Sequence, residues 1–313
     1  MANLFDLHVS TSELPQEIKN IRNKYKDYLQ IEKGHCPVTI RHKINALRTF
    51  IARSGIQHLS QLEELTVKDF FYKQCKDHEW SANTYRNYWK NLKCFFTWAI
   101  YNKLVKLESN PLDKLGKPKI HKVVPRRLSK EQLHSVFTAC CTFQWRYAVE
   151  RARNVAILAT FIYTGIRINE LINIRVEDVS IKQRTILIRK GKGGKVRIVK
   201  VPMELVRFLE DFESHIKRIN IQREYYFSSI GEYKIMTNKY IYTICKKLAD
   251  ATNIYFRPHM LRHTFASMAL EQKIPIASIS KIMGHESILY TQSYLAPEEN
   301  ILLSHFESLH FLT

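Results

Sequence analysis

The segment Thr185–Val201, TILIRKGKGGKVRIVKV, decides the fold class of this chain. Two stretches rich in β-branched residues, Thr185–Arg189 and Val196–Val201, are joined by a glycine-rich turn, a pattern that predicts a β-hairpin. On both sides of the hairpin, apolar residues recur at three- and four-residue spacing, which is typical of amphipathic helices. We therefore expect a mainly α-helical protein with one small antiparallel β-sheet.

The helical patterning divides the chain into two parts. Residues 1–108 contain several helical stretches and are expected to form a small all-helical domain. Residues 129–313 contain the hairpin and further helices, so they are expected to form a second, mostly helical domain. The intervening residues 109–128 hold six basic and no acidic residues from Lys114 to Arg127, a composition that predicts a charged linker.

The net charge points to a polyanionic partner. The 313 residues include 49 Lys and Arg against 29 Asp and Glu, a formal net charge of +20, which attracts nucleic acid or an anionic membrane. The most apolar stretch, Val155–Ile166, is about half of the ~20 residues that a membrane-spanning helix needs. The N-terminus has no basic start typical of a secretory signal. We therefore expect a cytoplasmic protein that binds nucleic acid and no membrane.

An arginine and a lysine-rich turn are the first candidates for chemistry on a phosphate. Arg167 follows a glycine just before a predicted helix, and Glu170 lies three residues further on. Taken alone, this pair is expected to be an ordinary surface ion pair. The hairpin turn contains Lys190, Lys192 and Lys195, and taken alone it predicts only a solvated basic ribbon.

A histidine-rich helix supplies the next candidates. His259 and His263 are four residues apart, a spacing at which two histidines can bind zinc. However, the metalloprotease pattern requires a glutamate where Met260 stands, and the six cysteines form no CxxC pair, so no metal site is predicted. His259 and Arg262 lie on one helix face and can reach one anion together.

In this order and at these separations, the segments resemble the signature of the tyrosine recombinases, and the chain length resembles the Xer subgroup. The family pattern is an arginine after Thr-Gly, a hairpin lysine, a His-x-x-Arg box, a Gly-His and a tyrosine nine residues beyond. It falls on Arg167, Lys192, His259, Arg262, His285 and Tyr294. The resemblance covers nearly the whole chain, because Thr39–Phe50 and Ser81–Trp98 are similar to the two helices with which the family grips DNA.

The resemblance implies a site-specific recombinase that cleaves and rejoins DNA through a 3′-phosphotyrosyl intermediate and a Holliday junction. It makes Tyr294 the nucleophile. Arg167 and Arg262 suit the implied chemistry, because planar guanidinium groups match phosphate oxygens and stabilise the negative charge of the transition state. His259 and His285 are expected to donate hydrogen bonds, and His259 can also accept the proton of the nucleophile.

The leaving 5′-hydroxyl group needs a proton, and a lysine on the glycine-rich turn can supply it. Lys192 is the expected general acid because it matches the Gly-Lys-Gly of the family, although composition alone does not separate it from Lys190 and Lys195. The resemblance gives Glu170 the role of orienting a neighbouring arginine or histidine. No phosphate-binding loop and no carboxylate cluster of a two-metal nuclease occurs in the sequence, so no cofactor, metal or ATP is expected.

Double-stranded DNA is the expected partner of the basic residues, and the aromatic residues between them are expected to form the core. The candidate DNA contacts are Arg41, Lys43, Arg86, Lys90, Lys93, Arg126 and Arg127. By resemblance, the chain is expected to form a dimer on each DNA site and a tetramer on two sites. The apolar tail, residues 296–313, either packs on its own domain or is donated to a neighbouring subunit.

Two other functions remain open on the sequence alone. A type IB topoisomerase uses similar chemistry on one duplex, and a sequence-specific DNA-binding protein can keep a silent site. The biological setting is also open between chromosome or plasmid dimer resolution, as in the Xer subgroup, and integration of a mobile element. A second recombinase or a directing protein is a possible further partner, and the nucleoid is the expected location.

Overall fold

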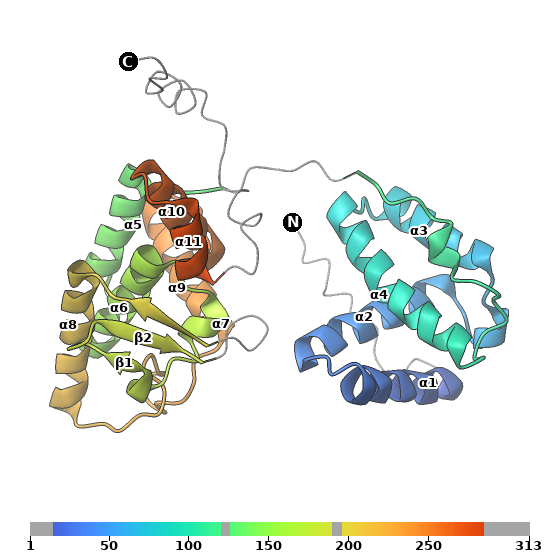
Figure 1. Ribbon diagram of the computed structural model, residues 1–313, viewed down its shortest axis with the longest axis horizontal. Coiled ribbons are helices and arrows are strands. Elements are labelled where there is room, and N and C mark those ends of the chain that lie inside the picture. The colour runs from blue at the N-terminus through green and yellow to red at the C-terminus, as the bar shows by residue number, and fades with distance from the viewer. Residues whose placement is uncertain (1–14, 120–125, 190–195, 285–313) are drawn as a thin grey trace, which may run out of the picture. The chain divides into compact units, whose positions relative to one another are not determined.

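The chain divides into two compact units, Met1–Lys122 and Val123–Thr313, shown in Figure 1. The computed structural model describes residues 15–119, 126–189 and 196–284. The prediction of a mainly helical protein with one small antiparallel sheet is confirmed. The division between the units falls within residues 109–128, the segment expected to be the linker.

The first unit consists of helices in its described part. They are α1 (Gln16–Asp27), continued by a π-helical turn (Tyr28–Glu32), α2 (Pro37–Ser54), α3 (Glu64–Asp77) and α4 (Ala82–Tyr101), with short 3-10 turns at Leu59–Gln61 and Pro111–Asp113. The start of α4 follows from its sequence, because the Ser81 side chain accepts a hydrogen bond from the backbone N–H of Thr84. Ser81 thus caps the helix, since the first backbone N–H groups of a helix have no acceptor within it.

Aromatic side chains form much of the core of this unit. Phe50 of α2 packs edge-to-face against Phe70 of α3 and Phe96 of α4, with ring centroids 5.0 and 5.6 Å apart. Such edge-to-face pairs add to the stabilisation that burial provides. Trp89 and Phe95 are also buried in this cluster, so the interpretation of the α4 aromatic residues as core is confirmed.

The residues directly after α4 pack on the first unit instead of leaving it. The indole N–H of Trp89 donates to the carbonyl of Leu112 at 3.1 Å. The Tyr85 hydroxyl donates to the carbonyl of Gly116 at 3.1 Å. These bonds fix the first part of the expected linker to α4, because buried polar groups are stable only when they are hydrogen-bonded.

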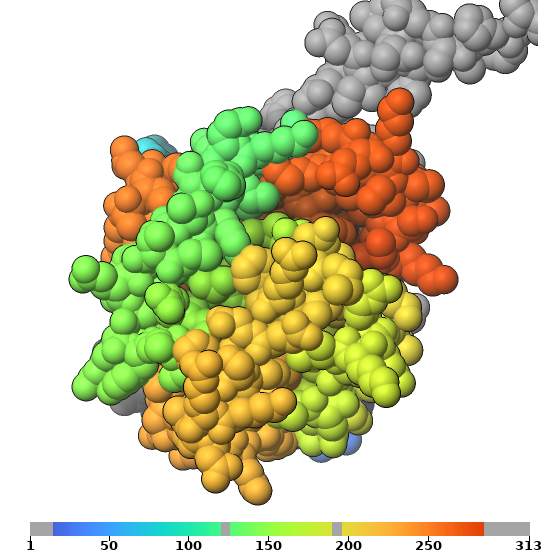
Figure 2. All heavy atoms as spheres, turned by 90° about the vertical axis from the view of Figure 1, so that its left-hand side faces the viewer, coloured from blue at the N-terminus to red at the C-terminus, as the bar shows by residue number. Residues whose placement is uncertain are grey.

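The second unit combines seven helices with three strands in its described part. The helices are α5 (Lys130–Thr142), α6 (Ala148–Thr164), α7 (Ile168–Leu171), α8 (Met203–Ile219), α9 (Asn238–Thr252), α10 (Pro258–Glu271) and α11 (Ile276–Met283), and the strands are β1 (Val179–Ser180), β2 (Thr185–Ile188) and β3 (Arg197–Lys200). The predicted capping box starts α5, where Ser129 and Gln132 bond each other's backbone N–H groups. In Figure 2, α5 (green) and α8 (gold) lie at the surface, and the rings of Phe137 and Phe208 join them at 5.1 Å.

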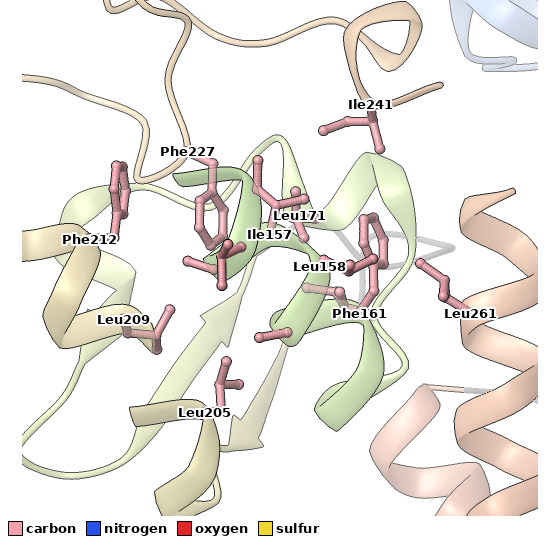
Figure 3. Close-up of a cluster of buried hydrophobic side chains, with 14 of the residues drawn as sticks. Ile157, Leu158, Phe161, Leu171, Leu205, Leu209, Phe212, Phe227, Ile241 and Leu261 are labelled. Atoms are coloured by element: carbon pink, nitrogen blue, oxygen red, sulfur yellow. The ribbon is translucent and has the colours of Figure 1, made fainter. Parts of the chain in front are cut away.

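Helix α6 is the centre of this unit. Every side chain from Ala152 to Phe161 is buried, which is typical of a central helix that is covered on all sides, and α5, α8 and α10 pack around it. Figure 3 shows this cluster of buried side chains. It includes Ile157, Leu158 and Phe161 of α6, Leu205, Leu209 and Phe212 of α8, and Leu261 of α10. In the described parts of the chain, no helix is both long and apolar enough to cross a membrane.

The three strands form an antiparallel sheet in the order β1-β2-β3. The register of the predicted hairpin pairs Thr185 with Lys200 and Ile188 with Arg197. Along β2 and β3, Ile186, Ile188 and Val199 are buried because alternate residues of a strand share one face. The hairpin strands are therefore confirmed, while their turn, residues 190–195, lies outside the described residues.

Replacing Leu209 tests the packing of α8 on α6. Leu209 is 1% exposed and Met203, on the same helix, is 53% exposed. We expect Leu209→Ala to lower the free energy of unfolding by about 2–5 kcal/mol, because it leaves a cavity. Met203→Ala should change it by no more than about 0.5 kcal/mol. Urea unfolding followed by circular dichroism measures both, and equal effects of the two variants would contradict the packing.

Candidate active site

The turn between α6 and α7 brings Arg167 to its position. Helix α6 ends at Gly165, whose φ of +57° lies in the left-handed region that favours glycine. A Cβ atom at this position would overlap the ring of Phe265. The chain then turns so that the backbone N–H of Arg167 donates to Oε2 of Glu170 at 3.0 Å. Glycine is thus required both for the turn and for the close approach of α10.

Glu170 is a buried carboxylate with two arginine partners. Its side chain is 2% exposed, and Oε1 accepts a hydrogen bond from Nη1 of Arg167 at 2.8 Å. Nη1 and Nη2 of Arg197 donate to Oε1 and Oε2, both at 2.8 Å. Burial raises the pKa of this carboxyl group, but the hydrogen bonds and charges of Arg197 and Arg167 outweigh it and lower the pKa. The expectation of an ordinary surface ion pair is therefore wrong.

Arg262 lies one turn into α10 and is also buried. Its Nη1 donates to the carbonyl of Gly165, and its Nη2 donates to the carbonyl of Met283 at 2.9 Å. Arg167 bonds the next residue, because its Nη2 donates to the carbonyl of Gly284 at 2.9 Å. The two arginines of the predicted signature therefore hold the end of α11 together, directly before His285 in the sequence.

Two histidines of α10 lie beside these arginines. Desolvation, together with the positive charges of Arg262 and Arg167, lowers the pKa of His259 below its usual value. Burial and the neighbouring charges of His259 and Arg262 lower the pKa of His263 to about 4. The two rings stack with centroids 6.0 Å apart. Both imidazoles are thus neutral near pH 7, and a neutral imidazole can accept a proton.

The arrangement provides fixed positive charge next to a neutral base. The guanidinium group of Arg167 is partly open to solvent, while Arg262 is buried. Such groups bind phosphate oxygens through charge-assisted hydrogen bonds. Among the residues that the structure describes, no three His, Cys, Asp or Glu side chains come together in a way that could hold a metal ion.

Three of the six signature residues are in the described structure, and it brings them together. Arg167, His259 and Arg262 interact across α7 and α10. Lys192, His285 and Tyr294 lie outside the described residues, as do Lys190, Lys195 and the tail 296–313. Their assignment remains a prediction.

The candidate DNA contacts differ in what they bind within the chain. Arg41, Lys90 and Arg126 are exposed and Lys43 is half-buried. Arg86 donates to the carbonyl of Pro118 at 2.9 Å. Lys93 pairs with Asp113, and Arg127 pairs with Glu271. Arg86, Lys93 and Arg127 therefore also have partners within the protein.

The sequence reasoning missed the role of Arg197. It treated this residue only as one of the basic residues of the hairpin, yet its side chain bonds Glu170 and is 15% exposed. A signal was present, because Arg197 alternates with the buried Val199 while the intervening Ile198 is 64% exposed. An arginine on the inward face of a strand indicates a buried anionic partner.

Family models match both units. The model described as the phage integrase family matches residues 126–300, and the phage integrase N-terminal SAM-like domain matches residues 21–106. Tyrosine recombinase XerC of Oceanobacillus iheyensis is 30% identical over 280 residues, which cover 86% of this chain and 89% of the relative. Tyrosine recombinase XerA of Thermococcus onnurineus is 26% identical over 281 residues, 89% and 91% of the two chains.

Solved structures share the fold. The XerH recombinase bound to a difH substrate, in a pre-cleavage complex, has a TM-score of 0.69 at 20% identity and covers 91% of this chain and 82% of that one. A lambda integrase dimer bound to a core site has a TM-score of 0.70 at 14% identity and covers 90% and 95%. At these identities the likeness establishes the fold alone.

The phage integrase model covers more than half of the chain, and the XerC relative matches most of its length. The chain therefore belongs to the phage integrase family. Within it, the chain is an Xer-like, site-specific tyrosine recombinase, which is a DNA strand transferase.

The depressed pKa of His263 predicts a loss of stability in acid. The folded state favours the neutral form of the His263 imidazole. The contribution of this group to the free energy of unfolding is therefore complete above pH 6.5 and is lost as the pH falls toward about 4. We expect the free energy of unfolding of the wild type to fall more steeply between pH 7 and pH 5 than that of His263→Asn. Urea unfolding at both pH values measures this difference, and parallel pH dependences would contradict the assignment.

Proposed function

We propose that this chain cleaves and rejoins two DNA duplexes through a covalent bond between Tyr294 and a 3′-phosphate. The observation that carries this proposal is the convergence of Arg167 and Arg262 on the end of α11, where Arg167 bonds Gly284 and Arg262 bonds Met283. Tyr294 follows ten residues after Gly284 in the sequence. XerH and lambda integrase, which share the fold, were solved bound to their DNA sites, which supports double-stranded DNA as the substrate.

In the proposed step, the Tyr294 oxygen attacks phosphorus and the bond from phosphorus to the 5′-oxygen breaks. Negative charge develops on the non-bridging oxygens, and Arg167 and Arg262 stabilise it. His259 accepts the proton of the tyrosine, because its lowered pKa keeps the imidazole neutral near pH 7. His285 donates a hydrogen bond to the phosphate. Rejoining is the reverse attack by a 5′-hydroxyl, so the phosphodiester energy is kept.

The leaving 5′-oxygen needs a proton, and Lys192 donates it. Lys192 lies between β2 and β3 in the sequence, which supports this role because Arg197, the first residue of β3, bonds Glu170. Glu170 bonds Arg167 and is proposed to orient its guanidinium group. Its lowered pKa keeps it ionised, so it has no proton to donate near pH 7.

The first unit is proposed to bind the DNA backbone through α2 and α4. Exposure supports Arg41 and Lys90 as phosphate contacts, since phosphate contacts supply affinity and register. Lys43 and Arg126 are proposed as further contacts. The weaker candidates are Arg86, Lys93 and Arg127, because each also has a partner within the protein.

The proposed assembly is a dimer on each DNA site and a tetramer on two sites. The tail 296–313 is proposed to join neighbouring subunits, since it carries apolar residues at helical spacing. The proposed biological role is resolution of chromosome or plasmid dimers, as in the Xer subgroup. Integration of a mobile element is the alternative role. A second recombinase or a directing protein is a proposed further partner, with the nucleoid as the place of action.

A nicked suicide substrate tests the nucleophile. A nick next to the scissile phosphate lets the cleaved fragment diffuse away, so the covalent adduct accumulates. We expect the wild type to form a DNA adduct that survives denaturing electrophoresis, and Tyr294→Phe to form none while still binding DNA. If neither the wild type nor Tyr294→Phe formed an adduct, the chain would bind DNA without cleaving it, and the proposal would be wrong.

The same proteins can be given two differently labelled duplexes that carry the site. A recombinase forms Holliday junctions between them, whereas a type IB topoisomerase forms the adduct on single duplexes alone. Adducts without junctions would therefore contradict the strand-exchange part of the proposal.

The salt dependence of DNA binding tests the phosphate contacts of the first unit. Each phosphate contact adds about 0.9 to the slope of log affinity against log salt concentration. Arg41→Ala combined with Lys90→Ala should therefore lower the magnitude of the slope by about 2. The matched control combines Lys24→Ala with Lys76→Ala, two exposed lysines on α1 and α3. Equal slopes in the two double variants would contradict the assignment.

A further inference from the structure

Arg197, the first residue of β3, joins three segments of the second unit. Its two terminal nitrogens donate to the two carboxylate oxygens of Glu170 on α7, both at 2.8 Å. Its Nε donates to the carbonyl of Ile282 on α11 at 3.3 Å. A planar guanidinium group that forms two parallel bonds to a carboxylate fixes geometry as well as adding energy. One side chain therefore connects the hairpin, α7 and the end of α11.

The turn at Gly284 fits closely against the same guanidinium group. Gly284 has a φ of +64°, and a Cβ atom there would lie 2.9 Å from Cζ of Arg197. The carbonyl of Gly284 accepts the hydrogen bond of Arg167. Arg167 and Arg197 thus hold this turn from two sides, and Glu170 lies between them with bonds to both.

The charge balance at Glu170 depends on both arginines. Arg167, directly before α7, and Arg197 on β3 contact the carboxylate, while Arg175, Arg189 and Tyr225 line a cavity of about 230 Å³ beside it. Arg175 pairs with Glu224 and Arg189 with Asp178 and Glu177, so their charges are balanced locally. Without Arg197, the buried carboxylate would keep Arg167 as its one contacting guanidinium group among the described residues, and burial would favour its protonation.

We propose that Arg197 is a positioning residue of the recombinase: by holding Glu170 and the Gly284 turn, it fixes the guanidinium group of Arg167 for the scissile phosphate. This inference rests on the proposed function, in which Arg167 binds that phosphate. Arg197 follows Lys192, the proposed general acid, by five residues in the sequence. The contact between Arg197 and Glu170 therefore also anchors β3, the strand that follows Lys192.

The test is the single-turnover rate of adduct formation on the suicide substrate at saturating protein. Arg197→Met should lower this rate by about 100-fold, since a small displacement of a catalytic group has an effect of that size. The matched control is Lys200→Met, which removes one exposed charge from the same strand. DNA affinity should change no more in Arg197→Met than in this control, because Arg197 faces the protein. A rate equal to that of the control would overturn the proposal.

The pH profile of the rate separates positioning from a general loss of folding. Loss of Arg197 raises the pKa of Glu170, so the acid limb of the Arg197→Met profile should lie at higher pH than that of the wild type. A variant that is merely less folded loses rate equally at every pH. Arg197→Lys keeps the charge without the paired bonds, so it should restore the wild-type profile and only part of the rate. An unmoved acid limb in Arg197→Met would overturn the proposal.

A double-mutant cycle with Glu170→Gln tests whether Arg197 acts through this carboxylate. On the Glu170→Gln background, Arg197→Met should lower the rate by far less than on the wild type, and it should not move the acid limb. An undiminished loss on that background would overturn the proposal. Failure of the proposed function is a separate result, because the wild type itself would then form no adduct through Tyr294.

Discussion

The buried carboxylate of Glu170 is the contact on which the rest of the site depends. It bonds two guanidinium groups and one backbone N–H, and a buried charge is tolerated only when it is paired in this way. Its partners come from α7 and β3, and both of these arginines also bond the end of α11. A single ionised group therefore sets the relative positions of three segments.

The cluster lies at the end of the buried helix α6. Because most of its side chains are buried, this helix packs against α5, α8 and α10, and the site begins where it ends. Gly165 lets the chain leave α6 in a left-handed turn against Phe265, and its carbonyl accepts a hydrogen bond from Arg262. The two arginines are thus attached to the most deeply buried helix of the unit, which suits a site that must hold its geometry while DNA strands are exchanged.

The sequence allowed correct prediction of the helices, the hairpin strands and the common face of His259 and Arg262, because each depends on residues a few positions apart. The family signature also grouped Arg167 with His259 and Arg262, and the structure places these three residues close together. Taken alone, the spacing of Arg167 and Glu170 suggested an exposed ion pair, but Glu170 is buried because α7 packs against other parts of the unit and Arg197 of β3 pairs with it. Likewise, the sequence did not reveal that Arg86 and Lys93 bond residues 118 and 113 of their own unit.

The sequence by itself determined the class of fold, the strong positive charge and the order of the predicted catalytic residues, since periodicity, composition and spacing are local properties of the chain. The tertiary structure decided which charges are paired. Arg197 meets Glu170 across 27 residues of sequence, and Arg167 meets Gly284 across 117. Such pairs form because a buried carboxylate and the carbonyls at a helix end must find donors within the folded chain.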